Sequence, residues 1–262
     1  MLCEVFEALL IAATASVVLA FAIPQLEPFL YYGKVQDSKK VEVKSLTEDP
    51  IRYLTQVLTV PKSHFKHFYI LSSALCTVII ALAVPDLSII SPRALLVLVL
   101  VSVHNYRRLF ESFLVERLSK NSRIQLPHYI AGVVFYLSQC VFLSQFLSDD
   151  DNSQLSAQET YLILVLYLVS TAVQFHAHHH LASLKKYSLP QAGLFKLVAC
   201  PHYLAEIGIY TAIALASKTP PSVVTLFWVI VNLGASANQT QLYYSQVYGN
   251  GAPKWAIIPL VI

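Results

Sequence analysis

The sequence predicts an all-α integral membrane protein, folded as a single bundle of about seven transmembrane helices. Of its 262 residues, 56% are hydrophobic and 13% are charged, whereas roughly 25% of the residues of a soluble domain are charged. Apolar runs long enough to cross a bilayer recur at 2–23, 65–85, 94–115, 128–147, 160–177, 199–217 and 222–244. No repeat or low-complexity linker separates these runs, so residues 1–262 are predicted to form one domain.

The first run is expected to be a retained span rather than a removable signal peptide. It carries Glu4 and Glu7, has no basic region before it, and reaches Pro24 without a small-residue cleavage motif. The four cysteines are dispersed and form no CxxC pair, which argues against a disulfide framework or a thiolate metal site.

The distribution of basic residues predicts the orientation. Sixteen of the 18 Lys and Arg residues lie in or beside the loops after the first, third, fifth and seventh helices, and only Arg93 and Lys218 lie on the other side. The positive-inside rule places the richer face in the cytosol, with the C-terminus there and the N-terminus opposite. The acidic run 149–151 then lies on the non-cytosolic side. The cytosolic loop 31–64 is long for a helical bundle, and such loops are typical of lids and binding loops.

The third helix carries a polar stripe. Its members stand at i, i+3, i+4 and i+7, on one helical face: His104, Arg107, Arg108 and Glu111. Glu111 can satisfy one guanidinium as an internal pair, which explains the stripe without any ligand. One carboxylate and two guanidiniums nevertheless leave one fork available for a phosphate, which arginine binds with two parallel hydrogen bonds.

The fifth helix ends in a cluster of histidines: His176, His178, His179 and His180. His176 and His180 are spaced so that they could bind one metal ion. The further histidine boxes of a di-iron hydroxylase or desaturase are missing, so we expect no metal, and histidines that hydrogen-bond or approach phosphates instead. Lys185, Lys186 and Tyr187 follow on the same membrane face.

Glu206 lies in the apolar run that follows the loop SLPQAGLF. An ionised Glu within a membrane-length helix costs on the order of 2.5–3.5 kcal/mol, so such groups usually face a polar cavity and a partner. Pro201 suits the first position of this helix, which places His202, Tyr203 and Glu206 on one face. We therefore expect Glu206 to face a protein-lined pocket, with His202 as the nearest candidate partner.

Three separated cytosolic segments, around Arg108, Lys185 and the His202/Glu206 pair, thus bring cations and hydrogen-bonding groups to the mouth of an apolar bundle. That combination suits a phosphorylated nucleotide cofactor. The chain has no GxGxxG after a strand and no Walker loop, so side chains within helices would have to hold such a cofactor.

At these motifs the sequence resembles the steroid 5-alpha-reductase superfamily, and within it the polyprenol (polyprenal) reductase branch. The matching stretches cover most of the chain: Tyr32-Gly33-Lys34, PKSHFKHFY, HNYRRLFESFLVERLS, HYIAGVVFYL and HLASLKKYSLPQAGLFKLVACPHYLAEIGIY. The longest is specific, since it combines a basic residue and Tyr, a PQxGxF loop, and a Glu four residues past a polar residue.

The resemblance implies a seven-helix reductase of the endoplasmic reticulum membrane, with a lumenal N-terminus, in which residues 188–262 form the C-terminal catalytic region. Such an enzyme uses NADPH to saturate the alpha-isoprene unit of a long polyprenyl lipid, for dolichol synthesis and protein N-glycosylation. Tyr32 would lie near the junction of cofactor and substrate. The cofactor would be held by His104, Arg107, Arg108, Lys185, Tyr187, His202 and Glu206, the last two at the nicotinamide end.

The chemistry of the reaction narrows the choice of substrate and of catalytic residues. Hydride adds readily to a C=C bond only when a conjugated carbonyl takes up the developing charge, so we expect polyprenal rather than polyprenol as the immediate substrate. The family shows a His near the last helix where this chain has Gln241. Gln241 can donate a hydrogen bond but not a proton, so Tyr243 or Tyr244 would take the acid role. The Gln-Glu pair of the steroid branch is also absent.

Two alternatives remain open at this point. The CPHY turn is similar to a motif of small membrane methyltransferases that act on isoprenoids or lipids, although their sulfonium cofactor offers no phosphate for Arg108 and Lys185. The second alternative is a catalytically impaired paralogue that binds cofactor or lipid, because Gln241 replaces the family His. In either case we expect a monomer in the bilayer that binds no nucleic acid.

Overall fold

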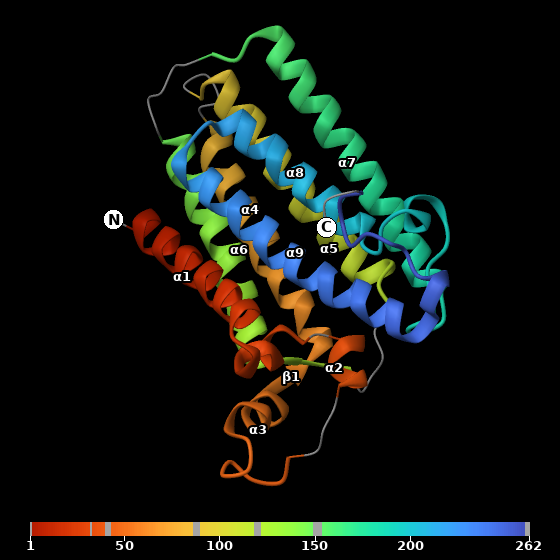
Figure 1. The fold of residues 1–262 in the computed structure, drawn as a ribbon. Coiled ribbons are helices and arrows are strands. Elements are labelled where there is room, and N and C mark those ends of the chain that lie inside the picture. The colour runs from red at the N-terminus through yellow and green to blue at the C-terminus, as the bar shows by residue number, and fades with distance from the viewer. Residues whose placement is uncertain are drawn as a thin grey trace.

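The computed structural model describes residues 2–31, 33–39, 43–85, 90–117, 122–148 and 154–259. Within these ranges, seven long helices form the molecule (Figure 1): α1 (Leu2–Ala22), α4 (Phe65–Ala83), α5 (Pro92–Leu114), α6 (Leu126–Leu147), α7 (Ala157–Ser183), α8 (Pro201–Ser217) and α9 (Pro220–Tyr248). Each coincides with one of the predicted apolar runs. The prediction of an all-α membrane bundle is therefore confirmed.

Five of these helices are long and apolar enough to cross a membrane, namely α1, α4, α6, α7 and α9. The other two differ for identifiable reasons. Helix α8 has only 17 residues, and α5 contains four charged residues, Arg93, Arg107, Arg108 and Glu111. Both pack against other long helices, since α8 contacts α7, α9 and α5. That they also span the bilayer, giving seven spans, stays a prediction.

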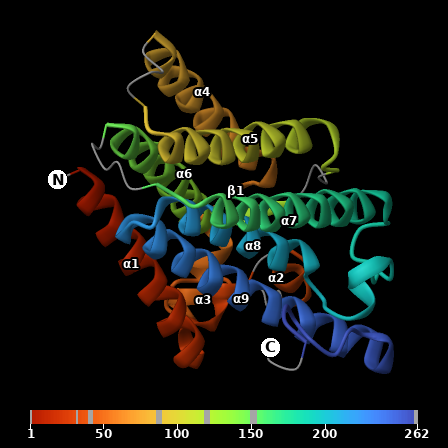
Figure 2. The same cartoon turned by 90° about the horizontal axis from the view of Figure 1, so that it is seen from above.

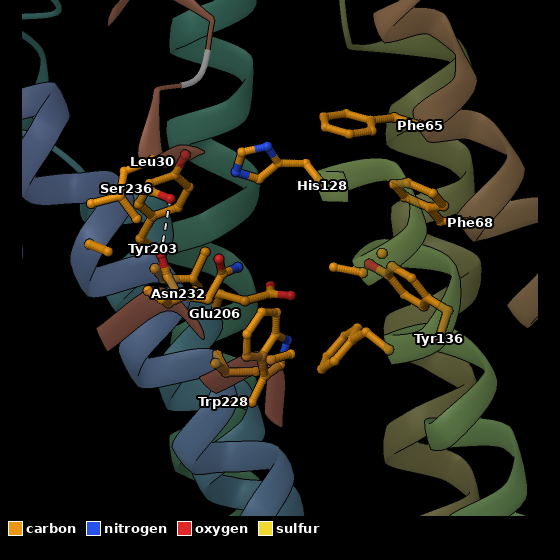
Figure 3. A pocket seen from close by; sticks show the side chains of 18 of the residues that line it. Leu30, Phe65, Phe68, His128, Tyr136, Tyr203, Glu206, Trp228, Asn232 and Ser236 are labelled. Carbon is orange, nitrogen blue, oxygen red and sulfur yellow. Dashed lines mark hydrogen bonds between the residues drawn. The ribbon is translucent and has the colours of Figure 1, made fainter. Parts of the chain in front are cut away.

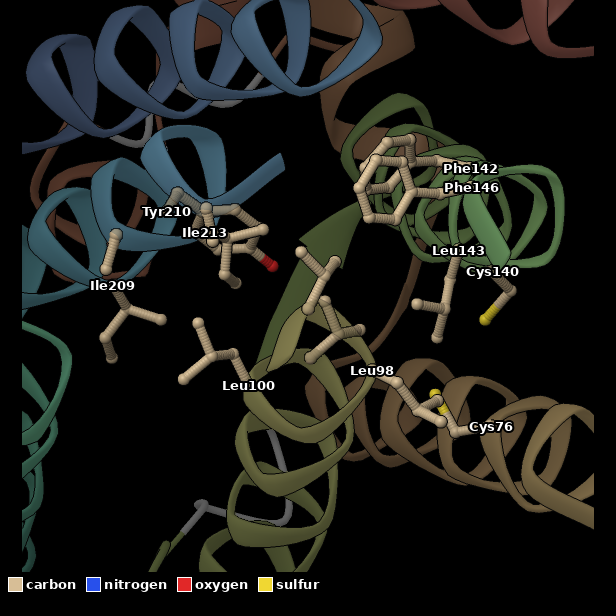
Figure 4. Close-up of a cluster of buried hydrophobic side chains, with 14 of the residues drawn as sticks. Cys76, Leu98, Leu100, Cys140, Phe142, Leu143, Phe146, Ile209, Tyr210 and Ile213 are labelled. Atoms are coloured by element: carbon tan, nitrogen blue, oxygen red, sulfur yellow. The ribbon is translucent and has the colours of Figure 1, made fainter. Parts of the chain in front are cut away.

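The helices pack in a continuous series of neighbours. Helix α7 lies along α8, α8 along α9, and α9 along α1, while α1 also contacts α6 and α4 packs on both α5 and α6. Seen from above, α1 and α9 run side by side along one face, with α4 and α5 on the far side of the bundle (Figure 2). The core between them includes Cys76, Leu100, Leu143 and Ile209 from four different helices (Figure 4).

Local sequence explains where the helices begin. Pro92 and Pro201 occupy first positions of α5 and α8, where their missing N–H has no helical partner to lose. The Ser91 hydroxyl caps α5 by accepting from the Ala94 N–H at 3.1 Å. Ser156 and Glu159 form a capping box at the start of α7.

Short elements cover one end of the bundle (Figure 1): a 3-10 turn (Pro24–Leu30), α2 (Lys34–Ser38), α3 (Pro50–Val57), and strand β1 (Thr59–Pro61) paired antiparallel with β2 (Arg123–Gln125). The sequence did not predict this small sheet. It ties the loop 31–64 to the segment before α6, so the loop lies across the end of the bundle. Lys40, Tyr32 and the acidic run 149–151 lie outside the described residues.

Glycine allows a close approach between α4 and α6. A Cβ atom on Gly132 of α6 would lie 2.6 Å from Cζ of Phe68 on α4, closer than atoms can approach.

Gly132→Ala should therefore lower the melting temperature of the purified protein, because overpacking costs about 1–3 kcal/mol. The control is Gly234→Ala, since a Cβ there meets no atom within 4 Å and alanine favours the helix by up to about 1 kcal/mol. Equal melting temperatures for the two variants would contradict this packing.

Candidate active site

One large cavity, of about 830 Å³, lies within the bundle. Helices α4 and α6 line one side, and α8 and α9 line the other (Figure 3), while α1, which packs on both α9 and α6, and the end of α7 also contribute. The cavity lining mixes apolar and polar side chains. The apolar ones include Ala13, Val17, Ala20, Leu30, Phe65, Phe68, Phe135, Trp228 and Leu233. The polar ones include Ser16, Lys62, Tyr69, Arg108, Glu116, Arg117, His128, Tyr136, Gln174, His178, His202, Tyr203, Glu206, Asn232 and Ser236.

The stripe on α5 forms one connected polar network, as its spacing predicted. Arg107 donates to Glu111 and lies 3.3 Å from His104 Nδ1. Arg108 also donates to Glu111, and its Nη2 lies 2.6 Å from the Tyr69 hydroxyl. Glu111 is fully buried, and its Oε2 lies 2.6 Å from His178 Nδ1. The network therefore joins α5 to α4 and to the histidine cluster of α7.

The expectation that one guanidinium fork stays free is wrong, because the structure supplies a second carboxylate. Arg108 Nη2 lies 3.2 Å from Glu116 Oε1 in addition to its contacts with Glu111 and Tyr69. Arg107 also donates to the side-chain oxygen of Gln174. Glu116 follows the last turn of α5, outside the helical spacing from which the stripe was inferred. An anion would have to exchange with Glu116 at Arg108.

Glu206 faces the cavity from α8 (Figure 3), as its apolar setting predicted. Its predicted partner was His202, and this is wrong. Oε1 of Glu206 lies 3.3 Å from His104 Nε2 on α5, and Oε2 accepts from Gln174 of α7. Gln174 was missed, although an amide in the middle of an apolar run is itself a signal of a buried polar site.

His202 lines the same cavity beside Glu206. Its ring lies edge-on to His178, with centroids 5.7 Å apart. Its Nδ1 atom is buried and has no hydrogen-bond partner within the part of the chain that the structure describes. A buried polar atom without a partner is costly, so this nitrogen is suited to a ligand group in the cavity.

Two lysines and an arginine bring positive charge to the cavity wall and its surroundings. Lys62 and Arg117 line it, and Lys34 lies beside Lys62. Lys34 Nζ stands over the ring of Tyr244, 3.5 Å from its centroid, and 5.6 Å from that of Tyr243. Burial, reinforced by the charge of Lys62, lowers the pKa of Lys34 to about 8. The sequence argument did not single out Lys62 or Arg117, because each reads as an ordinary basic residue of a cytosolic loop.

Besides His104 and Arg107, which contact lining residues from α5, four predicted site residues in the described part of the chain do not line the cavity. The Gln241 amide donates to the Ser245 hydroxyl at 2.9 Å and to the Pro253 carbonyl at 3.3 Å, so it holds the C-terminal segment against α9. Tyr243 lies on the neighbouring turn, near Lys34. Lys185 and Tyr187 follow α7 within two turns of the lining residues Leu181 and Ala182. The roles of all four, and that of Tyr32, which lies outside the described residues, stay predictions.

Comparison with known proteins identifies the class and then the family. Residues 122–262 match the family model described as 3-oxo-5-alpha-steroid 4-dehydrogenase. The chain is 34% identical over 238 residues to polyprenal reductase of Saccharomyces cerevisiae, covering 90% of this chain and 87% of that protein. It is 27% identical over 265 residues to polyprenal reductase 1 of Arabidopsis thaliana, covering 79% and 83%. It is likewise 27% identical over 289 residues to polyprenal reductase of Caenorhabditis elegans, covering 88% and 85%.

A helical membrane bundle with a polar-walled cavity, together with these matches, defines a membrane oxidoreductase. The chain belongs to the 3-oxo-5-alpha-steroid 4-dehydrogenase family, the steroid 5-alpha-reductases. The family membership inferred from the sequence motifs is confirmed.

The pKa of Lys34 predicts a specific pH dependence of stability. Lys34 binds its proton more weakly in the folded protein than in the unfolded chain, whose lysine pKa is near 10.4. The unfolded state therefore holds more protons between pH about 8 and about 10, and stability rises with pH in that window. The melting temperature of the wild type should rise relative to that of Lys34→Met as the pH is raised from 7 to 10. A difference that stays constant with pH would contradict the burial of this ammonium.

Proposed function

We propose that the protein is an NADPH-dependent polyprenal reductase of the endoplasmic reticulum membrane. It saturates the alpha-isoprene double bond of a long polyprenal, and its product feeds dolichol synthesis for protein N-glycosylation. One observation carries the proposal: a single cavity is lined both by cationic and hydrogen-bonding side chains and by apolar side chains that include Trp228 and residues of α1. The relatives named polyprenal reductase point to the same substrate. The N-terminus would lie in the lumen and the C-terminus in the cytosol.

The residues present fit a phosphorylated dinucleotide. The cavity volume of about 830 Å³ lies toward the upper end of the roughly 300–1,000 Å³ usual for ligand sites. Arg108, Lys62 and Arg117 supply cations along its wall, and Lys185 and Tyr187 follow the last lining turn of α7. The buried Nδ1 of His202 could form a hydrogen bond with a group of the cofactor. His104 and Arg107 would not contact the cofactor. They would position the cavity-lining residues Glu206 and Gln174, with which they interact.

The reaction needs three things from the protein. When bound, NADPH supplies the hydride that adds to the beta carbon of the conjugated aldehyde. The chain must hold the aldehyde oxygen with hydrogen-bond donors as negative charge builds there, deliver a proton to the alpha carbon, and keep water away from the reacting atoms. The family motifs make Tyr32 a candidate for one of these roles, whereas Gln241 and Tyr243, the other predicted candidates, do not line the cavity.

The apolar lining of the cavity suits the first isoprene units of the lipid. Phe65 and Phe68 lie across the cavity from Trp228 (Figure 3), and Phe135 and Leu233 also line it, so a branched hydrocarbon would contact apolar surface that shields it from water. The rest of a long chain would leave beside α1 into the bilayer. Because only an aldehyde delocalises the charge that hydride addition creates, polyprenal is the immediate substrate rather than polyprenol.

The position of Gln241 bears on the impaired-paralogue alternative. Gln241 lies outside the cavity lining and is bonded to the C-terminal segment. A His-to-Gln difference at such a position removes no group from the cavity wall, which supports an active reductase.

The direct test is NADPH oxidation by the purified protein in nanodiscs, with polyprenal, polyprenol and an enone steroid offered separately. We expect oxidation with polyprenal and a saturated aldehyde as product. Oxidation with the steroid alone would reassign the substrate. Failure to bind NADPH at all would overturn the reductase proposal and favour a methyltransferase, which binding of a sulfonium cofactor would then show.

Glu206 should be needed for cofactor binding. Glu206→Gln keeps the side-chain volume but removes the charge that pairs with His104, so we expect NADPH affinity to fall at least about tenfold, or about 1.4 kcal/mol. Glu159→Gln is the matched control, because Glu159 is exposed at the far end of α7 and pairs with Lys218 at 2.6 Å. Titration of each variant with NADPH measures the effect. Equal affinities in the two variants would remove Glu206 from the cofactor site.

A further inference from the structure

Two tyrosine hydroxyls stand together on the cavity wall that faces Glu206. Tyr69 comes from α4 and Tyr136 from α6, and both line the cavity with 8% and 7% of their surface exposed. Their rings meet edge-on with centroids 5.4 Å apart. Figure 3 shows Tyr136 across the open space from Glu206. The pair therefore bounds the space between α6 and α8.

A buried cation supports this pair from behind. Arg108 Nη2 donates to the Tyr69 hydroxyl at 2.6 Å, and the guanidinium carbon lies 4.8 Å from the centroid of the Tyr69 ring. Because a guanidinium can only donate hydrogen bonds, this contact uses an oxygen lone pair and leaves the Tyr69 proton available. A charged donor also polarises the hydroxyl and strengthens the hydrogen bond that it gives in turn.

The two hydroxyls together have one proton that can be donated to a ligand. Two hydroxyls carry two protons, and at most one of them can lie between the two oxygens. Within the described part of the chain, the structure shows no hydrogen bond from either hydroxyl to another protein acceptor; Tyr69 accepts from Arg108. One O–H is therefore left to point into the cavity, where a substrate oxygen can accept it.

We propose that the Tyr69–Tyr136 pair, backed by Arg108, is the hydrogen-bond donor that holds the aldehyde oxygen during reduction. This inference rests on the proposed function and names two catalytic residues for it. The reacting enal lies between the tyrosine pair on α4 and α6 and the Glu206 and His202 wall on α8. Arg108 thereby serves the substrate side as well as the cofactor side of the cavity.

The movement of electrons during the reaction explains why the tyrosine pair should lie at the aldehyde oxygen. As the beta carbon gains hydride from the cofactor, its C–H bond forms and the electrons of the C=C bond move toward the aldehyde oxygen. The tyrosine O–H stabilises the negative charge there. After hydride transfer, a proton that comes ultimately from the solvent adds to the alpha carbon and restores the carbonyl. Phe68 stacks on Tyr136 with centroids 5.9 Å apart, so the donor lies in an apolar setting where its hydrogen bond is strong.

The test is single-turnover reduction of polyprenal, followed through the loss of NADPH absorbance. Tyr69→Phe removes one oxygen atom and should slow hydride transfer by about 10²–10³-fold, the usual cost of losing one such donor. Its affinity for NADPH should stay within about twofold, which also shows that it is folded. Tyr136→Phe should slow the step less, and the double variant should be less impaired than the product of the two effects, because the hydroxyls act as a unit.

Tyr167→Phe is the matched control. Tyr167 is equally buried, but its hydroxyl donates to the Leu100 carbonyl at 2.8 Å and does not line the cavity. Hydride transfer in this variant should match the wild type. If wild type reduces polyprenal and Tyr69→Phe does so at the same rate, the inference is wrong while the proposed function stands. If wild type itself oxidises no NADPH with polyprenal, the proposed function fails first.

A fluorinated tyrosine at position 69 provides a second measurement if the phenylalanine variant does not fold. It keeps the hydroxyl and nearly the size of the ring but makes the phenol a stronger hydrogen-bond donor. Under the proposal, the rate of hydride transfer and its dependence on pH both change. A rate and pH profile identical to those of the wild type would overturn the proposal.

Discussion

The pairing of two arginines with the fully buried Glu111 is the constraint on which the rest of the structure depends. Arg107 and Arg108 both donate to this carboxylate, and it lies 2.6 Å from His178 of α7. Without it, Arg107 would have no carboxylate partner and the buried Arg108 would keep only Glu116, and breaking a buried ion pair costs about 3–5 kcal/mol. Because Glu111 compensates them, α5 can stand inside the bundle and hold polar groups on α4, α7 and α8 at fixed positions.

The network supplies part of the polar lining of the cavity. Side chains that the arginines reach, directly or through Gln174, include Tyr69, Glu116 and Glu206, and apolar side chains of α1, α4, α6 and α9 line the same cavity. A charged cofactor and a hydrocarbon chain can therefore meet in one enclosed space. Hydride transfer to a conjugated aldehyde requires such a meeting, with donors for the oxygen and little water nearby.

Hydrophobic run length was enough to locate all seven long helices, and the cost of burying Glu206 was enough to predict that it faces a pocket. Its partner could not be predicted, because helical spacing shows which residues share a face but not which helix lies opposite. His104 and Gln174 approach Glu206 from α5 and α7, and only the packing reveals this. In the sequence, Tyr69 looks like an ordinary interfacial aromatic residue, and Glu116 lies beyond the periodic stripe. Neither could therefore be identified as a site residue before the fold was known.

The most direct test of the account is a cryo-EM structure of the protein in nanodiscs with NADP⁺ and a long-chain polyprenal. The account predicts that the nicotinamide lies against Glu206 and His202, that the aldehyde oxygen lies within hydrogen-bond distance of the Tyr69–Tyr136 pair, and that the hydrocarbon passes Trp228 toward α1. Density for the lipid or the nicotinamide outside this cavity would contradict the central claim that one space, built around the α5 arginines, holds both reactants.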